Sequence, residues 1–157
     1  MEDTTASTGD AGHDRAVPIH LWIVGALALL WNAFGGYDYV MTRTKNVDYL
    51  ASMMPQVDPA TTLAYIDSMP LLSSAGWALG VWGGLLGAVL LLMRSRHAVP
   101  VFLVSLLGAV VTFGLQFFGP VRPPEALASP TMPIVITLIS LGLFLYARTM
   151  RQRGVLA

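Results

Sequence analysis

The chain has 157 residues, of which 55% are hydrophobic and 11% are charged, and its nine basic and nine acidic residues give a formal net charge of zero. A soluble domain typically has about 25% charged residues, so this composition excludes an ordinary water-soluble fold. Zero net charge offers no basic surplus for a nucleic-acid partner. The chain contains no cysteine, which excludes disulfides, thiolate catalysis and cysteine metal sites.

The chain begins with a polar segment, residues 1–17, that is rich in Thr, Ser, Gly and Asp. It has too few apolar side chains to fold alone, so we expect a disordered tail. A signal peptide would need a positively charged start and a short apolar stretch, whereas this tail holds four acidic residues and only Arg15. The triplet Ala33-Phe34-Gly35 nevertheless resembles a cleavage site. Cleavage of the first apolar run is therefore the alternative to a retained span.

Four long apolar runs dominate the rest of the sequence, at about residues 19–40, 71–93, 98–118 and 132–148. A helix needs about 20 mostly apolar residues to cross a hydrocarbon core about 30 Å thick. Each run meets or approaches that length. The sequence therefore predicts an all-α membrane protein, in which residues 18–149 form a bundle of four transmembrane helices.

The positions of Lys and Arg predict how the spans are oriented, because these residues are enriched in cytoplasmic loops. One side of the predicted bundle has Arg15, Arg94, Arg96, Arg148, Arg151 and Arg153, and the other has Arg43, Lys45 and Arg122. We therefore expect both termini in the cytoplasm, with residues 150–157 forming a basic cytoplasmic tail.

The first outer loop, residues 42–70, is predicted to contain two short helices. Asp58 followed by Pro59 is typical of an N-cap and a first helical position, and predicts a helix to about Ser68. A second helix is expected over residues 47–54. Such short helices are unstable alone in water, so we expect them to lie on the membrane surface or cap the bundle. A lid over a site in the bundle is the functional alternative. The second outer loop, residues 119–130, holds four prolines and is expected to be extended.

Glycine is concentrated in the second span. Gly76, Gly80 and Gly84 are spaced by four residues, and Gly83 and Gly87 form a second stripe beside them. Small residues at this spacing let two membrane helices approach closely. The stripe therefore predicts a packing face, whose partner is either another helix of this chain or a second protein.

Four polar side chains inside the spans are candidates for a functional role: Asn32, Asp38, Thr112 and Gln116. A charged side chain costs about 3 kcal/mol at the centre of a membrane helix. We expect the polar stripes of the first and third spans to face each other, so that Asn32 could meet Thr112 or Gln116. These residues either line a solute path or form interhelical hydrogen bonds. For Asp38, the structural alternative is an ion pair with Arg43 or Lys45.

The sequence contains no constellation of residues that indicates catalysis. It has no Ser/His/Asp set, no phosphate-binding loop and no pair of acids in one span. The three histidines, His13, His20 and His97, lack a second ligand at helical spacing. We therefore expect no enzymatic activity, no metal and no cofactor.

Four stretches of the sequence resemble a family of small bacterial inner-membrane proteins with four spans. They read LWIVGALALLWNAFGGYDYVMTRT, WALGVWGGLLGAVLLL, AVPVFLVSLLGAVVTF and LYARTMRQRGVLA, and the likeness begins at about Pro18. The resemblance implies four spans and a bacterial inner-membrane location. Some members carry the label sugar transporter, but the family has no established activity, so no site residue is implied.

Two functions are compatible with these features. The first is a component of small-solute transport that acts as an oligomer, because four helices leave little room for an alternating-access site in one chain. The second is a non-transporting scaffold or accessory subunit, which binds another membrane protein through the glycine-rich second span. In both cases the protein lies in the lipid bilayer.

Overall fold

The structure, a computed structural model, describes residues 17–157, so the predicted tail lies outside the described residues except for Val17. This part of the chain is helical and contains no strand. Its elements are α1 (Ile19–Arg43), α2 (Val47–Met53), α3 (Pro59–Ser68), α4 (Leu71–Leu92), α5 (Ala98–Phe118), the short 3-10 helix η1 (Glu125–Leu127) and α6 (Thr131–Gln152). Four of them, α1, α4, α5 and α6, are long and apolar enough to cross a membrane. The predicted all-α bundle of four membrane helices is therefore confirmed.

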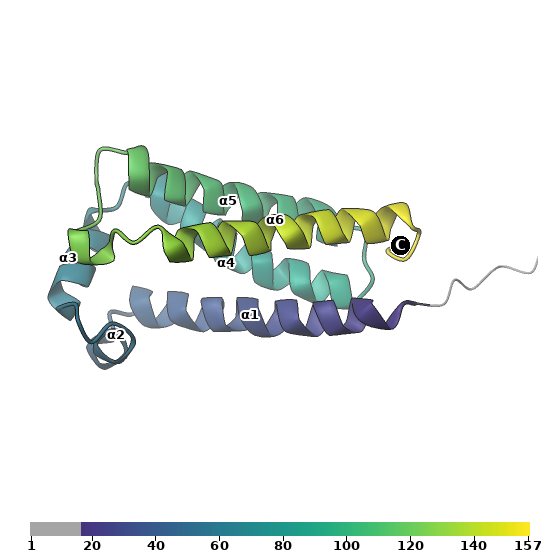
Figure 1. Cartoon of the computed structure of the whole chain (residues 1–157), viewed down its shortest axis with the longest axis horizontal. Helices are drawn as coiled ribbons and strands as arrows, with labels where there is room; N and C mark the ends of the chain where they lie inside the picture. The colour runs from purple at the N-terminus through teal and green to yellow at the C-terminus, as the bar shows by residue number, and fades with distance from the viewer. Residues whose placement is uncertain (1–16) are drawn as a thin grey trace, which may run out of the picture.

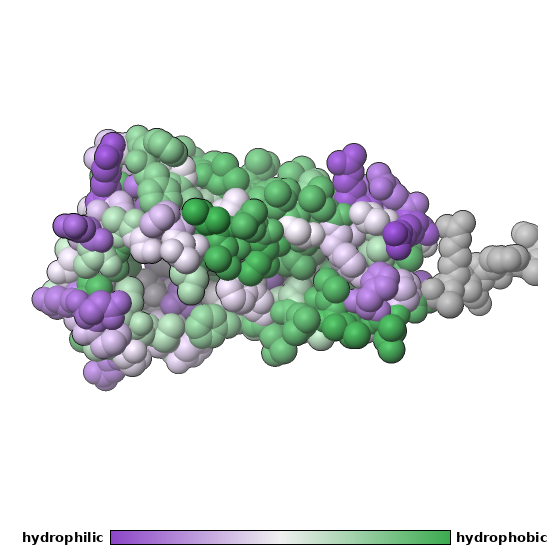
Figure 2. Space-filling model, in the orientation of Figure 1, coloured by the Kyte–Doolittle hydropathy of each residue, from purple (hydrophilic) through white to green (hydrophobic). Residues whose placement is uncertain are grey.

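The four long helices lie side by side along the long axis of the molecule (Figure 1). Helix α4 packs against both α1 and α5, and α6 packs against α5. We call the end that carries α2, α3 and η1 the loop end. The opposite end, which carries Arg94, Arg96, Arg148, Arg151 and Arg153, is the arginine end. Figure 2 shows hydrophobic side chains around the middle of this face and hydrophilic ones at both ends, as a membrane-spanning bundle requires.

Three of the membrane helices end in the same hydrogen-bonded turn, in which one residue adopts a left-handed conformation. At the end of α6 this residue is Gly154, with a φ of 71°, and the next amide, that of Val155, donates to the carbonyl of Met150 at 3.0 Å. Helices α1 and α4 end similarly at Lys45 and Arg94, with φ of 57° and 58°. A non-glycine residue in this conformation costs about 1 kcal/mol. These turns set where the helices stop.

The last membrane helix is longer than its apolar run suggested. Helix α6 continues to Gln152, beyond the expected end at residue 148, because arginines at the membrane boundary do not interrupt a helix. The chain then reverses at Gly154, and residues 155 and 156 return to the bundle. Within residues 150–157, where the sequence predicted a basic tail, the structure therefore has the end of α6 and a segment packed against the bundle.

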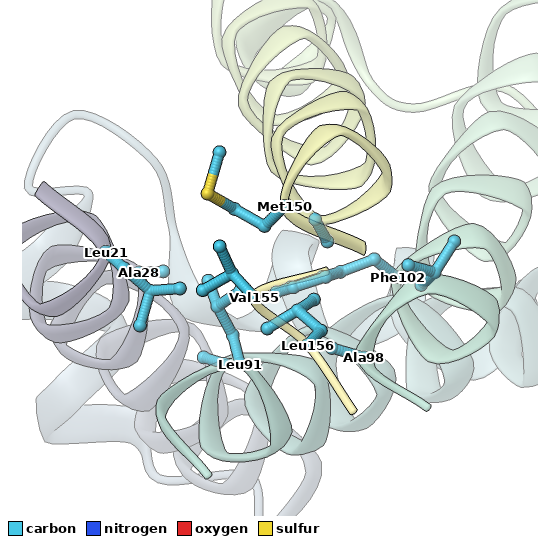
Figure 3. Close-up of a cluster of buried hydrophobic side chains, with 11 residues drawn as sticks. Leu21, Ala28, Leu91, Ala98, Phe102, Met150, Val155 and Leu156 are labelled. Atoms are coloured by element: carbon cyan, nitrogen blue, oxygen red, sulfur yellow. The ribbon is translucent and has the colours of Figure 1, made fainter. Parts of the chain in front are cut away.

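A cluster of buried apolar side chains fills the arginine end. It contains Leu21, Ala28, Ala88, Leu91, Ala98, Val99, Phe102, Ala147, Met150, Val155 and Leu156. In Figure 3, Val155 and Leu156 point into the space between the helices, close to Leu91 and Met150. The amide of Arg96 donates to the carbonyl of Ala157 at 2.8 Å and holds the returning segment in place. The arginine end is thus packed shut by the chain's own residues.

Candidate functional site

Helices α4 and α5 approach each other closely, and this approach depends on glycine in both. A Cβ atom added to Gly108 would lie 2.6 Å from the carbonyl oxygen of Gly76 and 2.7 Å from the amide nitrogen of Gly80. The hydroxyl of Ser105 donates to the carbonyl of Gly80 at 2.6 Å. The hydroxyl of the buried Thr112 makes a similar bond, to the carbonyl of Ser73 at 3.1 Å. Thr112 therefore joins two helices and does not face an open path.

The remaining glycines of the stripe also meet neighbours within this chain. An added Cβ would contact Ser105 from Gly83 and the ring of Phe102 from Gly87. At Gly84 it would contact both Asn32 of α1 and Ser105 of α5. The partner of the glycine stripe, left open by the sequence, is therefore chiefly α5 of the same chain.

The polar stripes of the first and third spans do not face each other as expected, because α4 lies between α1 and α5. The side-chain amide of Asn32 donates to the carbonyl of Ala28 at 2.8 Å. Its carboxamide oxygen occupies the space that a Cβ atom on Gly84 would need. Ser105 approaches the same space from the other side, 3.3 Å from the position of the added Cβ. Asn32 therefore comes near Ser105 across a glycine, and meets neither Thr112 nor Gln116.

Asp38 lies near the loop end of α1 and is held by a residue of the first outer loop. The hydroxyl of Tyr49, on α2, donates to the carboxylate of Asp38 at 2.8 Å. Burial, and then the hydrogen bond to Asp38, raises the pKa of Tyr49 above its ordinary value. Tyr49 therefore stays protonated and keeps its proton as a hydrogen-bond donor. The ring of Tyr37 packs edge-on against Tyr49, with centroids 5.5 Å apart.

The ion pair with Arg43 or Lys45, which was the structural alternative for Asp38, does not form within residues 17–157. Lys45 pairs instead with Asp67 of α3, at 2.7 Å, and this pair is more than half exposed. Arg43 is exposed and has no acidic partner in the same range. The half-buried carboxylate of Asp38 therefore has one neutral donor, Tyr49, and no cation among the residues described.

The two short helices of the first outer loop form where the sequence predicted them. The side chain of Asn46 accepts from the amide of Tyr49 at 2.9 Å and caps α2, and Asp58 accepts from the amide of Ala60 at 2.9 Å and caps α3. Thr62 of α3 is only 5% exposed, and its hydroxyl has no partner within the described part of the chain. Sequence reasoning missed both Tyr49 and Thr62, because nothing in their spacing shows which helix they dock against.

The loop end is less completely filled than the arginine end. Figure 2 shows a hollow on this face between α6 and α1, beside α3. Gln116, on the part of α5 nearest the loop end, is half-buried and makes no hydrogen bond to the described residues. No group of three potential metal ligands occurs in residues 17–157. Asp38, Thr62 and Gln116 therefore give the loop end hydrogen-bonding capacity that the fold itself does not use.

Comparison with family models, with curated proteins and with solved structures finds no match to this chain. The resemblance to small four-span membrane proteins therefore stays an expectation.

Proposed function

We propose that the protein is a component of small-solute transport across a membrane, that it acts as an oligomer, and that Asp38 is its central solute-binding side chain. One observation supports this most. The carboxylate of Asp38 is half-buried in a membrane-spanning helix, and its one hydrogen-bond partner in residues 17–157 is the neutral hydroxyl of Tyr49.

The charge on Asp38 is only partly compensated by its surroundings. Helix α1 has 25 residues, so at 1.5 Å per residue it is about 37 Å long and extends beyond a hydrocarbon core of about 30 Å. Asp38 lies five residues before its end, near the membrane boundary, where a carboxylate still loses part of its hydration. One neutral donor replaces only part of that hydration. A cationic or hydroxyl-rich solute would supply the missing partners.

The contact between Tyr49 and Asp38 also links the bundle to the first outer loop, which contains α2 and α3. Tyr49 belongs to α2, which lies at the loop end outside the four long helices (Figure 1). A solute that takes over the hydrogen bond to Asp38 would release α2 from α1. This coupling favours the lid interpretation of the first outer loop over a passive cap.

The oligomer is needed because a single chain offers no continuous polar path. The apolar cluster closes the arginine end, and Thr112 and Asn32 are already bonded to backbone carbonyls. Either α6 moves away from α5 or a second copy supplies the other half of the path. The scaffold alternative has less support, since α5 already covers most of the glycine stripe that was expected to bind another protein.

Flux through proteoliposomes tests this proposal. Purified chain would be reconstituted and challenged with protons, choline, glycerol, xylose and glucose, with empty liposomes as the reference. We expect the wild type to raise permeability to at least one of these probes, and Asp38→Asn to remove at least about nine-tenths of that flux, as for a charge needed at the binding step.

The matched control is Asp48→Asn, which removes an exposed carboxylate on α2 from the same end of the molecule. It should leave flux unchanged. Flux that survives Asp38→Asn would show that Asp38 is not the binding group. Wild-type liposomes no more permeable than empty ones to all five probes would refute transport of these solute classes.

A further inference from the structure

We propose that a groove between α5 and α6 at the arginine end binds the headgroup and upper acyl chain of an anionic phospholipid. The groove has a volume of about 560 Å³. It is lined by Val99, Pro100 and Leu103 of α5 and by Phe144, Arg148, Arg151 and Gln152 of α6. It borders the apolar cluster, with which it shares Val99, and it lies at the opposite end of the bundle from Asp38. The inference therefore does not depend on the proposed transport function.

The lining residues are ordered by polarity along the membrane normal. On α6, Phe144, Arg148 and Arg151 are spaced by four and three residues and so share one face of the helix. At 1.5 Å per residue, Arg151 lies about 10 Å closer to the helix end than Phe144. On α5, Pro100 is in the first turn and Leu103 is a turn deeper. The groove is therefore basic at the membrane surface and apolar toward the bilayer centre, as a phospholipid is anionic at one end and apolar at the other.

The two arginines that line the groove, Arg148 and Arg151, have no acidic partner within residues 17–157. The acidic residues of that range, Asp38, Asp48, Asp58, Asp67 and Glu125, belong to the other half of α1 and to the outer loops. Arginine forms bidentate hydrogen bonds with phosphate oxygens. The first turn of α5 adds the positive end of a helix dipole beside the same position.

The apolar wall distinguishes a lipid from a free anion. Val99, Leu103 and Phe144 would add nothing to the binding of inorganic phosphate, but they would contact an acyl chain. Basic pockets between membrane helices are a general way of binding anionic lipid headgroups. A competing occupant is the segment before α1, because residues 1–16 contain Glu2, Asp3, Asp10 and Asp14.

Native mass spectrometry of the full chain in detergent tests the proposal, with phosphatidylglycerol and phosphatidylcholine of identical acyl chains as probes. We expect the wild type to bind phosphatidylglycerol about tenfold more tightly than phosphatidylcholine, because two arginines near the membrane surface attract the anionic headgroup. The double variant Arg148→Gln/Arg151→Gln should lose this preference. Arg122→Gln, an exposed arginine in the second outer loop, should retain it.

A second variant separates loss of the site from loss of the fold. Leu103→Ala keeps both arginines and should weaken the binding of both lipids. Because Leu103 is 38% exposed and lies outside the apolar cluster, the protein should keep its melting temperature within a few degrees. Equal binding of the two lipids by the wild type, or an unchanged preference in the double arginine variant, would overturn the proposal. The proposal would also be overturned if inorganic phosphate, at the same concentration as the lipid, displaced the lipid from the protein.

The tail is tested in the full chain by neutralising Glu2, Asp3, Asp10 and Asp14 together as Gln or Asn. An unchanged lipid preference supports the lipid as the occupant. If a preference for phosphatidylglycerol appears only after neutralisation, the tail occupies the groove and the proposal fails.

Discussion

The two ends of the bundle differ in how the space between the helices is filled. At the arginine end, four helices and the returning segment enclose Phe102, Met150, Val155 and Leu156, each no more than 7% exposed. At the loop end, Asp38, Thr62 and Gln116 remain half-buried or buried with few partners or none among residues 17–157. One end is closed by apolar packing, and the other keeps polar groups available.

Some contacts between the helices stabilise the whole bundle, and others stabilise one end of it. The approach of α4 to α5 through Gly76, Gly80 and Gly108 serves the whole bundle, because both other long helices pack on this pair. Contact between α1 and α6 is local: at the arginine end, His20 and Tyr146 share a hydrogen bond of 2.6 Å.

The largest effect is expected from Phe102→Ala, which empties the centre of the arginine end. Phe102 is 1% exposed and packs on Gly87, so the change should lower the free energy of unfolding by about 3 kcal/mol. Titration with sodium dodecyl sulfate in bicelles measures this. Phe118→Ala, at an 88% exposed position of the same helix, is the control and should cost little. Similar losses in the two variants would contradict a core confined to the arginine end.

A smaller loss, about 2 kcal/mol, is expected from Gly108→Ala, because the added methyl group meets the backbone of α4 and cannot be relieved by a rotamer change. The control is Gly114→Ala in the same helix, where nothing lies within 4 Å of the added atom. It should be neutral or slightly stabilising, since alanine favours the helix. The same unfolding titration applies, and an unaffected Gly108→Ala variant would rule out the close α4–α5 approach.

Tyr49→Phe acts on the loop end alone. It removes the hydrogen bond to Asp38 while keeping the ring, and should loosen α2 by about 1 kcal/mol. Hydrogen exchange of the amides of residues 47–53 should become about fivefold faster, while α4 and α5 keep their rates. Tyr37→Phe is the control, because its hydroxyl has no hydrogen bond to residues 17–157. Unchanged exchange in α2 would show that Asp38 does not hold the cap.

Lys45→Ala should have the smallest effect. The pair with Asp67 is exposed, with relative exposures of 54% and 57% for the two side chains, and such pairs contribute about 0.5 kcal/mol or less. The residue also occupies a left-handed turn, so Lys45→Gly should recover part of the loss. A loss above about 1 kcal/mol in Lys45→Ala would mean that the cap depends on this ion pair more than exposed pairs allow.

The sequence was sufficient for the elements and insufficient for their pairing. Apolar length predicted four spans, and Asp58 with Pro59 placed the start of α3 correctly. Hydropathy could not show that α4 separates the polar stripes of α1 and α5, because a stripe shows which face is polar and not which helix covers it. The tucked segment was missed for a related reason. Gly154 was a readable signal for a helix end, but the return of Val155 to the core depends on contacts with helices distant in sequence.

Cysteine labelling tests the central contrast between the two ends most directly, since the natural chain has no cysteine. Single cysteines at residues 38 and 116 would be compared with single cysteines at residues 88 and 147, both of which are fully buried at the arginine end. The reagent would be a small, water-soluble, charged thiosulfonate, applied to both faces of membrane vesicles. We predict rapid labelling of the first pair and none of the second. Equal labelling of the two pairs, or protection of residues 38 and 116, would contradict a polar loop end and a sealed arginine end.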